Sequence, residues 1–135
     1  MKNDTIVIVD YGSQYTQLIA RRIREKNVHS IIIPYDFKKE YIDIYNIKGF
    51  ILSGGPSSVY EKNSPNLNQI IFNYNLPILG ICYGLQLLIE NFSGKVENIG
   101  SGEYGSADIE IQKSSVLFNG VMDKSKVWMS HGDKI

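Results

Sequence analysis

Runs of β-branched and other apolar residues recur along the first 81 positions and alternate with stretches in which apolar residues follow helical spacing. The apolar runs predict buried parallel strands, because parallel strands are covered on both faces and carry few polar residues. We expect these strands at 5–10, 30–34, 49–53 and 77–81. Strands that alternate with helices are typical of a three-layer α/β fold, in which helices cover both faces of a mostly parallel sheet.

The segments between these strands predict the helices. Apolar residues at helical spacing indicate helices over 14–26 and 83–92, and residues 40–45 form a weaker helical turn. Ser64 followed by Pro65 predicts the N-cap and first position of a further helix. Gly94 is the candidate for the C′ position after the helix at 83–92.

Beyond residue 94 the pattern changes to a period of two. Strands are expected at 95–99, 107–112 and 127–130, and the alternation over 107–112 is typical of a half-exposed, antiparallel strand. Neither a linker nor a repeat separates this segment from the rest. We therefore expect residues 1–135 to form one domain, with the later strands as its extension.

The composition of the chain excludes several classes of function. Apolar residues make up 43% of the chain and charged residues 21%, as in ordered globular proteins. The 14 basic residues are balanced by 14 acidic ones, which argues against a nucleic-acid partner. We find neither a signal peptide nor a membrane-spanning apolar run, so no membrane partner is expected and the predicted location is the cytoplasm. Cys82 is the single cysteine, so we expect no internal disulfide and no metal site.

Cys82 is the main candidate for chemistry. It lies in the segment 80–84, GICYG, at a predicted turn from a strand to a helix, the arrangement of a nucleophile elbow. Gly80 and Gly84 would let neighbouring backbone approach this strained turn. The start of the following helix favours the thiolate, the reactive form. A lone cysteine is more often a small buried apolar residue, but this turn favours a nucleophile.

A nucleophile that attacks a carbonyl needs hydrogen-bond donors for the oxyanion. The backbone N–H of Tyr83, directly after the nucleophile, is the expected first donor. The second must come from another loop, and the segment 53–56, SGGP, follows a different strand. Gly55 is our choice, since paired glycines let a backbone N–H approach a ligand. Taken alone, this segment would be an ordinary turn.

The segments 10–22 (DYGSQYTQLIARR), 52–56 (LSGGP) and 80–86 (GICYGLQ) together resemble the class I, or triad, glutamine amidotransferases. The segments 10–22 and 128–133 (WMSHGD), with 103–105 (EYG), are similar to one branch of that class. In that branch the domain supplies ammonia to an ATP-pyrophosphatase synthetase domain that aminates a purine nucleotide. The resemblance extends from about Ile6 to Asp133.

The resemblance implies a reaction and a set of site residues. Cys82 would attack the side-chain amide of L-glutamine, release ammonia and leave a γ-glutamyl thioester that water hydrolyses to glutamate. The oxyanion would be held by the N–H groups of Gly55 and Tyr83. The implied substrate-binding residues are Gln86, Ser130, Gly132 and Asp133. No cofactor is implied for this domain; ATP and Mg²⁺ belong to the synthetase domain, which we expect to be absent from residues 1–135.

This chain differs from the family mainly at the general base. The resemblance places the base and its orienting acid in a His-Pro-Glu motif downstream of 130–133, and residues 1–135 contain no such motif. Of the two histidines, His29 is expected to be uninvolved, and His131 lies in the substrate-loop motif. We therefore expect a domain incomplete at its C-terminus, and 135 residues that are nearly inactive alone. Both a two-domain enzyme and a separate glutaminase subunit stay open as the source.

Two other readings remain. The chain could be a catalytically silent amidotransferase-like binding or regulatory module, although Cys82 and its flanking glycines argue against lost activity. It could also be the class I amidotransferase of another synthase, or a peptidase-like relative, since the whole class shares the elbow. Flavodoxin-like phosphate binding is disfavoured, because the segment 11–14 (YGSQ) lacks a dense glycine or hydroxyl loop.

Overall fold

The computed structural model describes the backbone of residues 2–134, and the side chains of 2–97 and 104–129. The described chain divides into two compact units, residues 2–96 and 97–134, each with its own sheet. No helix in the described part of the chain is long and apolar enough to cross a membrane.

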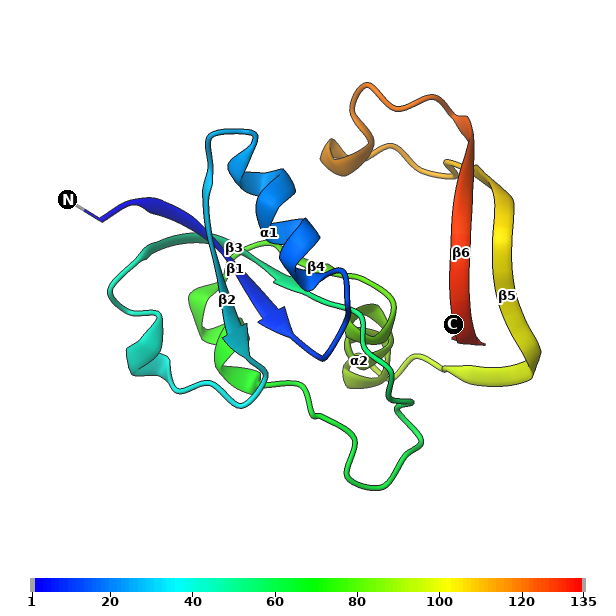
Figure 1. Cartoon of the computed structure of the whole chain (residues 1–135), viewed down its shortest axis with the longest axis horizontal. Helices are drawn as coiled ribbons and strands as arrows, with labels where there is room; N and C mark the ends of the chain where they lie inside the picture. Colours follow the sequence, from blue (N-terminus) through cyan, green and yellow to red (C-terminus); the bar gives the residue numbers. More distant parts are fainter. Residues whose placement is uncertain (1, 135) are drawn as a thin grey trace. The chain divides into compact units, whose positions relative to one another are not determined.

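The first unit is built on a four-stranded parallel sheet (Figure 1). Its strands lie in the order β2-β1-β3-β4, so the two central strands are β1 and β3. All four predicted strands are confirmed, with ends that differ by at most three residues. Their bounds are β1 (Asp4–Asp10), β2 (His29–Pro34), β3 (Asn46–Leu52) and β4 (Ile78–Gly80).

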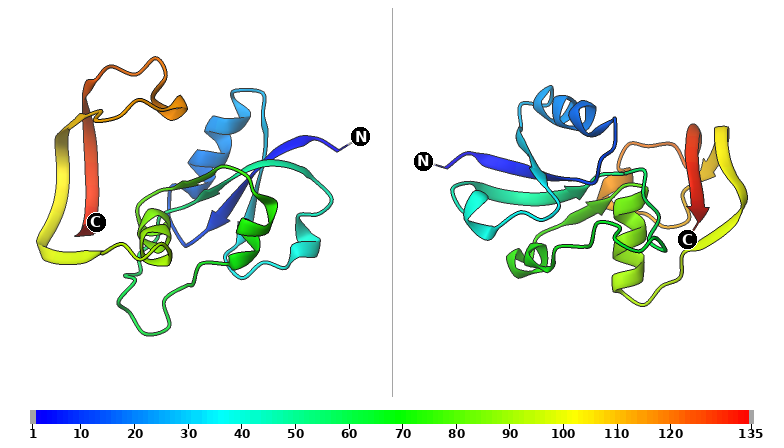
Figure 2. Two further views of the ribbon diagram at one scale, coloured as in Figure 1. Left: turned by 180° about the vertical axis from the view of Figure 1, so that it is seen from behind. Right: turned by 60° about the horizontal axis from the view of Figure 1, so that its bottom comes forward.

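Helices cover both faces of this sheet, as Figure 2 shows in its right-hand view. Helix α1 (Thr16–Arg24) lies on one face, where the Ser30 hydroxyl donates a hydrogen bond of 3.0 Å to the Ala20 carbonyl. Helix α2 (Tyr83–Asn91) and the 3-10 helix η2 (Gln69–Tyr74) lie on the other; a short 3-10 turn, η1 (Lys39–Tyr41), precedes β3. The predicted three-layer α/β class is confirmed.

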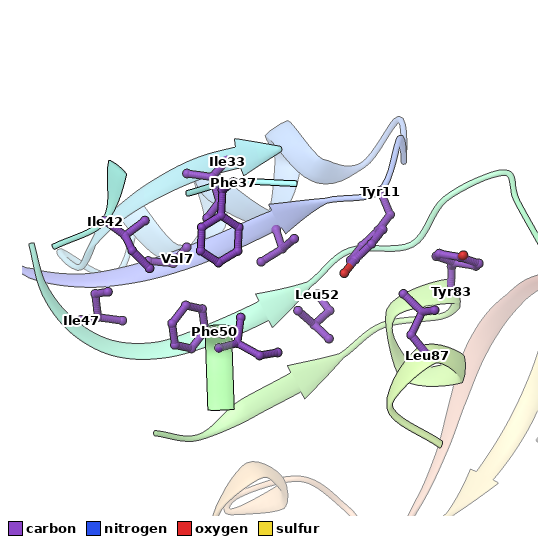
Figure 3. Close-up of a cluster of buried hydrophobic side chains, with 12 residues drawn as sticks. Val7, Tyr11, Ile33, Phe37, Ile42, Ile47, Phe50, Leu52, Tyr83 and Leu87 are labelled. Atoms are coloured by element: carbon purple, nitrogen blue, oxygen red, sulfur yellow. The ribbon is translucent and has the colours of Figure 1, made fainter. Parts of the chain in front are cut away.

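The core of the first unit lies between the parallel sheet and the helices on one of its faces, α2 and η2 (Figure 3). Val7 and Val9 of β1 contribute to this core, while Ile8 between them is fully buried on the opposite face. Burial on both faces explains the continuous apolar run of β1. Each such side chain contributes about 1.5 to 3 kcal/mol when fully buried. The core extends to Tyr11 and Tyr83, at the carboxyl ends of the strands.

The helix predicted to begin at Ser64 and Pro65 begins later and is a 3-10 helix. Asn68 is its N-cap, and the Asn68 side chain accepts a hydrogen bond of 3.2 Å from the N–H of Ile70. The carbonyl of Pro65, which a helix starting there would use internally, instead accepts a 2.6 Å hydrogen bond from the Tyr83 hydroxyl. Residues 64–67 therefore lie outside the helix, with the Pro65 carbonyl bonded to a distant side chain.

The end of α2 also differs from expectation. Ser93, and not Gly94, occupies the left-handed C′ position, with φ of 64°. The N–H of Ser93 donates to Glu90 and that of Gly94 to Ile89, which is the Schellman pattern. A Cβ at position 94 would lie 2.5 Å from Cγ2 of Ile89, so any larger residue there needs the Ile89 side chain to move.

The second unit is an antiparallel pair of strands, β5 (Glu97–Glu110) and β6 (Lys124–Lys134), with a 3-10 turn, η3 (Val116–Phe118), between them. The predicted antiparallel strand at 107–112 is confirmed as far as Glu110, and the strand at 127–130 lies within β6. In the described residues these strands pair only with each other and do not extend the parallel sheet. That residues 1–135 act as one domain stays a prediction.

Candidate active site

Three loops meet where the parallel strands of the first unit end. Within the sheet, β2 lies next to β1 on one side, and the chain then crosses over to form β3 on the other side of β1. The order of the strands therefore reverses between β1 and β3. In open α/β sheets, ligands bind outside the carboxyl ends of the strands at such a reversal. The segments that follow β1, β3 and β4 are 11–15, 53–56 and 81–82.

Cys82 connects β4 to α2 in a strained turn. Its backbone has φ of 49° and ψ of −113°, a conformation that residues other than glycine rarely adopt. Such strain persists only where the surrounding structure imposes it, and it is concentrated at functional sites. The thiol is free and exposed at the first turn of α2. The predicted elbow is therefore present in the structure.

Gly80 and Gly84 let two elements approach this turn closely. A Cβ at Gly80 would lie 2.6 Å from Cα of Leu85, in α2. A Cβ at Gly84 would lie 2.5 Å from Cβ of Leu52, in β3, and still closer to the Leu52 carbonyl oxygen. Ordinary carbon contacts are about 3.5 to 4.0 Å. These two positions accept only glycine, and together they hold the nucleophile turn against the sheet.

The glycine loop after β3 lies beside Cys82. A Cβ built on Gly54 would lie 3.4 Å from Cβ of Cys82, so the space between the two residues is about the size of one methyl group. Gly55 packs against the backbone of Tyr11, and a Cβ there would meet the Tyr11 carbonyl carbon at 3.0 Å. The structure thus brings together the two loops that the sequence predicts to cooperate.

Ser53 joins all three elements of the site and is fully buried. Its N–H donates to the carbonyl of Val9 at 3.0 Å, and its carbonyl accepts from the N–H of Gly84 at 3.1 Å. Its hydroxyl accepts from the N–H of Tyr11 at 2.9 Å and donates to the carbonyl of Gly54 at 2.8 Å. Sequence reasoning placed Ser53 in the glycine loop but assigned it no role; a hydroxyl directly after a buried strand was the only signal.

Tyr83 contributes to the site through both its backbone and its side chain. The residue is 2% exposed, and its ring lies edge-on to the ring of Tyr11, with the centroids 5.5 Å apart (Figure 3). Burial raises the pKa of the Tyr83 phenol. Because Tyr83 is the first residue of α2, its N–H has no acceptor within the helix. Among the described residues, neither this N–H nor that of Gly55 has a backbone partner.

A nucleophile elbow beside a glycine loop occurs in several enzyme classes, and comparison with known proteins decides among them. Residues 7–135 match the family model described as "Glutamine amidotransferase class-I". This chain belongs to the class I glutamine amidotransferases. The family predicted from the sequence is therefore confirmed.

Several curated relatives with high similarity are named "GMP synthase [glutamine-hydrolyzing]". The protein from Psychrobacter arcticus is 49% identical over 100% of this chain and 26% of its own length. The one from Prochlorococcus marinus is 52% identical over 99% of this chain and 26% of its own length. The chain thus spans about a quarter of these relatives. They belong to the branch that the segments 10–22 and 128–133 predict.

Solved structures agree with this family. A Thermoplasma acidophilum protein described as part of a GMP synthase is 30% identical, with a TM-score of 0.83 over 99% of this chain and 67% of its own. A glutamine amidotransferase of Thermotoga maritima, 19% identical with a TM-score of 0.69 over 99% of this chain and 63% of its own, shows the shared fold.

The predicted substrate-binding residues of this amidotransferase lie in both units. Gln86 is buried one turn after the nucleophile in α2, and its N–H donates to the Cys82 carbonyl at 3.0 Å. Ser130, Gly132 and Asp133 lie in β6 of the second unit, and their side chains are outside the described residues. Their predicted role in recognising the amino-acid end of glutamine stays a prediction.

The two histidines also lie in different units. His29 begins β2, at the end of the parallel sheet opposite to Cys82, and its Nδ1 lies 2.9 Å from the Thr5 hydroxyl. This position excludes His29 as the base for Cys82 within the first unit. His131 lies in β6, where its backbone is paired with Glu103, and its side chain is outside the described residues. The described part of the chain contains no cluster of His, Cys, Asp and Glu that could hold a metal ion.

Proposed function

We propose that residues 1–135 form the glutaminase part of a GMP synthase, which hydrolyses L-glutamine to supply ammonia for the ATP-dependent amination of XMP to GMP. The observation that carries the proposal is the strained Cys82 turn at the start of α2, beside the glycine loop. The names of relatives about 50% identical to this chain support the choice of synthase.

In this proposal the Cys82 thiolate attacks the side-chain carbonyl carbon of glutamine. A bond forms between Sγ and that carbon, and the electron pair of the C=O bond moves to oxygen. The N–H groups of Gly55 and Tyr83 stabilise the oxyanion. As the intermediate collapses, the C–N bond breaks, and the nitrogen takes a proton and leaves as ammonia. Water then cleaves the thioester, giving glutamate and restoring the thiolate.

Both steps need a group that moves protons, which the family resemblance assigns to a His-Pro-Glu motif outside residues 1–135. General acid-base catalysis contributes roughly 10² to 10⁴-fold. We therefore expect a polypeptide of these residues alone to hydrolyse glutamine slower than the full-length protein by about that factor. The proposed partner is the ATP-pyrophosphatase synthetase domain, which would bind ATP and Mg²⁺, and the proposed compartment is the cytoplasm.

The test uses the full-length protein, with glutamate release measured in the presence of XMP, ATP and Mg²⁺. We expect glutamine hydrolysis coupled to GMP formation, and its loss in Cys82→Ser. Free ammonia should restore GMP formation in that variant, because the substitution spares the synthetase reaction.

A protein that neither hydrolyses glutamine nor reacts at Cys82 with a diazo ketone analogue of glutamine would refute the proposal and favour a silent binding module. Hydrolysis of glutamine without GMP formation would indicate the amidotransferase of another synthase.

A further inference from the structure

The Ser53 hydroxyl holds one particular peptide group. It donates a 2.8 Å hydrogen bond to the carbonyl of Gly54, and its oxygen is fixed in turn by the N–H of Tyr11 at 2.9 Å. Both bonds are buried, and the Ser53 side chain has no exposed surface. Water therefore does not compete for either bond, which makes the orientation of this hydroxyl well defined.

The carbonyl of Gly54 and the N–H of Gly55 belong to the same planar peptide group. The described residues contain no cis peptide bond, so this C=O and N–H point in opposite directions. Fixing the direction of the Gly54 carbonyl therefore fixes the direction of the Gly55 N–H. A peptide between two glycines rotates unusually easily, because neither neighbour has a Cβ to restrict φ and ψ.

We propose that Ser53 is a positioning residue for glutamine hydrolysis: its hydroxyl holds the Gly54–Gly55 peptide in the orientation that presents the Gly55 N–H to the oxyanion. This inference rests on the proposed function. Ser53 and the peptide group that it holds also lie next to the nucleophile turn. The Ser53 carbonyl accepts from the N–H of Gly84 in the first turn of α2, and a Cβ built on Gly54 would lie 3.4 Å from Cβ of Cys82.

Removal of the hydroxyl should reduce turnover more than substrate binding. In Ser53→Ala the peptide can rotate and turn its carbonyl toward the oxyanion, so part of the oxyanion stabilisation is lost in the transition state only. Loss of one oxyanion donor costs about 10²- to 10³-fold in kcat. We expect kcat for glutamine to fall at least tenfold in the full-length protein, and KM to change less than about threefold.

Alkylation of Cys82 by iodoacetamide separates this effect from damage to the nucleophile. In that displacement the thiolate forms an S–C bond as iodide leaves, and no oxyanion develops. The alkylation rate of Ser53→Ala should stay within about twofold of that of the unsubstituted protein, while kcat falls. Ser30→Ala is the matched control, because Ser30 is also fully buried and donates to a backbone carbonyl, that of Ala20, on the face opposite to α2. It should leave kcat unchanged.

Three results would overturn the proposal: kcat of folded Ser53→Ala within twofold of the original, a parallel loss of kcat and alkylation rate, or an equal loss in Ser30→Ala. If Ser53→Ala does not fold, Ser53→Cys decides, because its thiol is nearly isosteric and a weaker donor; the same loss of kcat at constant alkylation rate is expected. An unsubstituted protein that does not hydrolyse glutamine would instead refute the proposed function.

Discussion

Replacing Gly84 by alanine would add a methyl group that overlaps sterically with Leu52 of β3. The new Cβ would lie 2.5 Å from Cβ of Leu52, about 1 Å short of an ordinary carbon contact. Strand β3 is paired on both sides, with β1 and β4, so it cannot retreat, and α2 must move instead. That movement also stretches the 3.1 Å hydrogen bond from the Gly84 N–H to the Ser53 carbonyl.

The cost follows from these two effects. Overpacking a tight site costs about 1 to 3 kcal/mol, and a weakened buried hydrogen bond costs about 1 kcal/mol more. We therefore expect Gly84→Ala to lower the local stability of α2 by about 2 to 4 kcal/mol. A displacement of about 1 Å near the nucleophile would also reduce glutamine turnover by roughly 10²-fold.

Hydrogen–deuterium exchange of the full-length protein, followed in peptides that cover α2, measures the local opening free energy. Gly49→Ala is the matched control, because it adds a methyl group to β3 itself, where the Cβ would lie 3.2 Å from the Pro77 carbonyl oxygen and needs only a small adjustment. Its expected effect is below about 1 kcal/mol. Unchanged protection of α2 in Gly84→Ala, or an equal loss in Gly49→Ala, would refute this reasoning.

Two further predictions concern the pKa of Tyr74 and the last turn of α2. Burial, reinforced by a 2.8 Å hydrogen bond to Asp43, raises the pKa of Tyr74 from 10.0 to about 12. Because the folded protein holds this proton more tightly, the contribution to stability is complete below pH 10 and is lost as pH rises toward 12. Urea unfolding between pH 9 and 12 should show a smaller alkaline loss in Tyr74→Phe than in the original, and equal slopes would contradict the assignment. Ser93→Gly should stabilise the last turn of α2 by about 0.5 to 1 kcal/mol, since glycine adopts φ of 64° without a Cβ penalty; faster amide exchange there would count against the C′ assignment.

Sequence patterns determined the strands and the nucleophile turn, because both depend on local chemistry. A run such as 5–10 is apolar throughout only if both faces are covered, which is the property of a central parallel strand. The segment 80–84 places glycines two residues before and after Cys82, and the structure shows that both are sterically required. The pairing of this turn with the loop at 53–56 also followed, since carboxyl ends of parallel strands share one edge of a sheet.

The tertiary structure decided what depends on contacts between distant residues. Ser64 and Pro65 carry a helix-start signal, but the helix begins at Gln69, and the Pro65 carbonyl accepts a hydrogen bond from the distant Tyr83 hydroxyl. The role inferred for Ser53 also depends on the fold, because its partners include Tyr11, 42 positions away, and a serine after a strand does not reveal them. Local propensity determines which elements form, whereas long-range hydrogen bonds determine where an element ends and which peptide group is held in place.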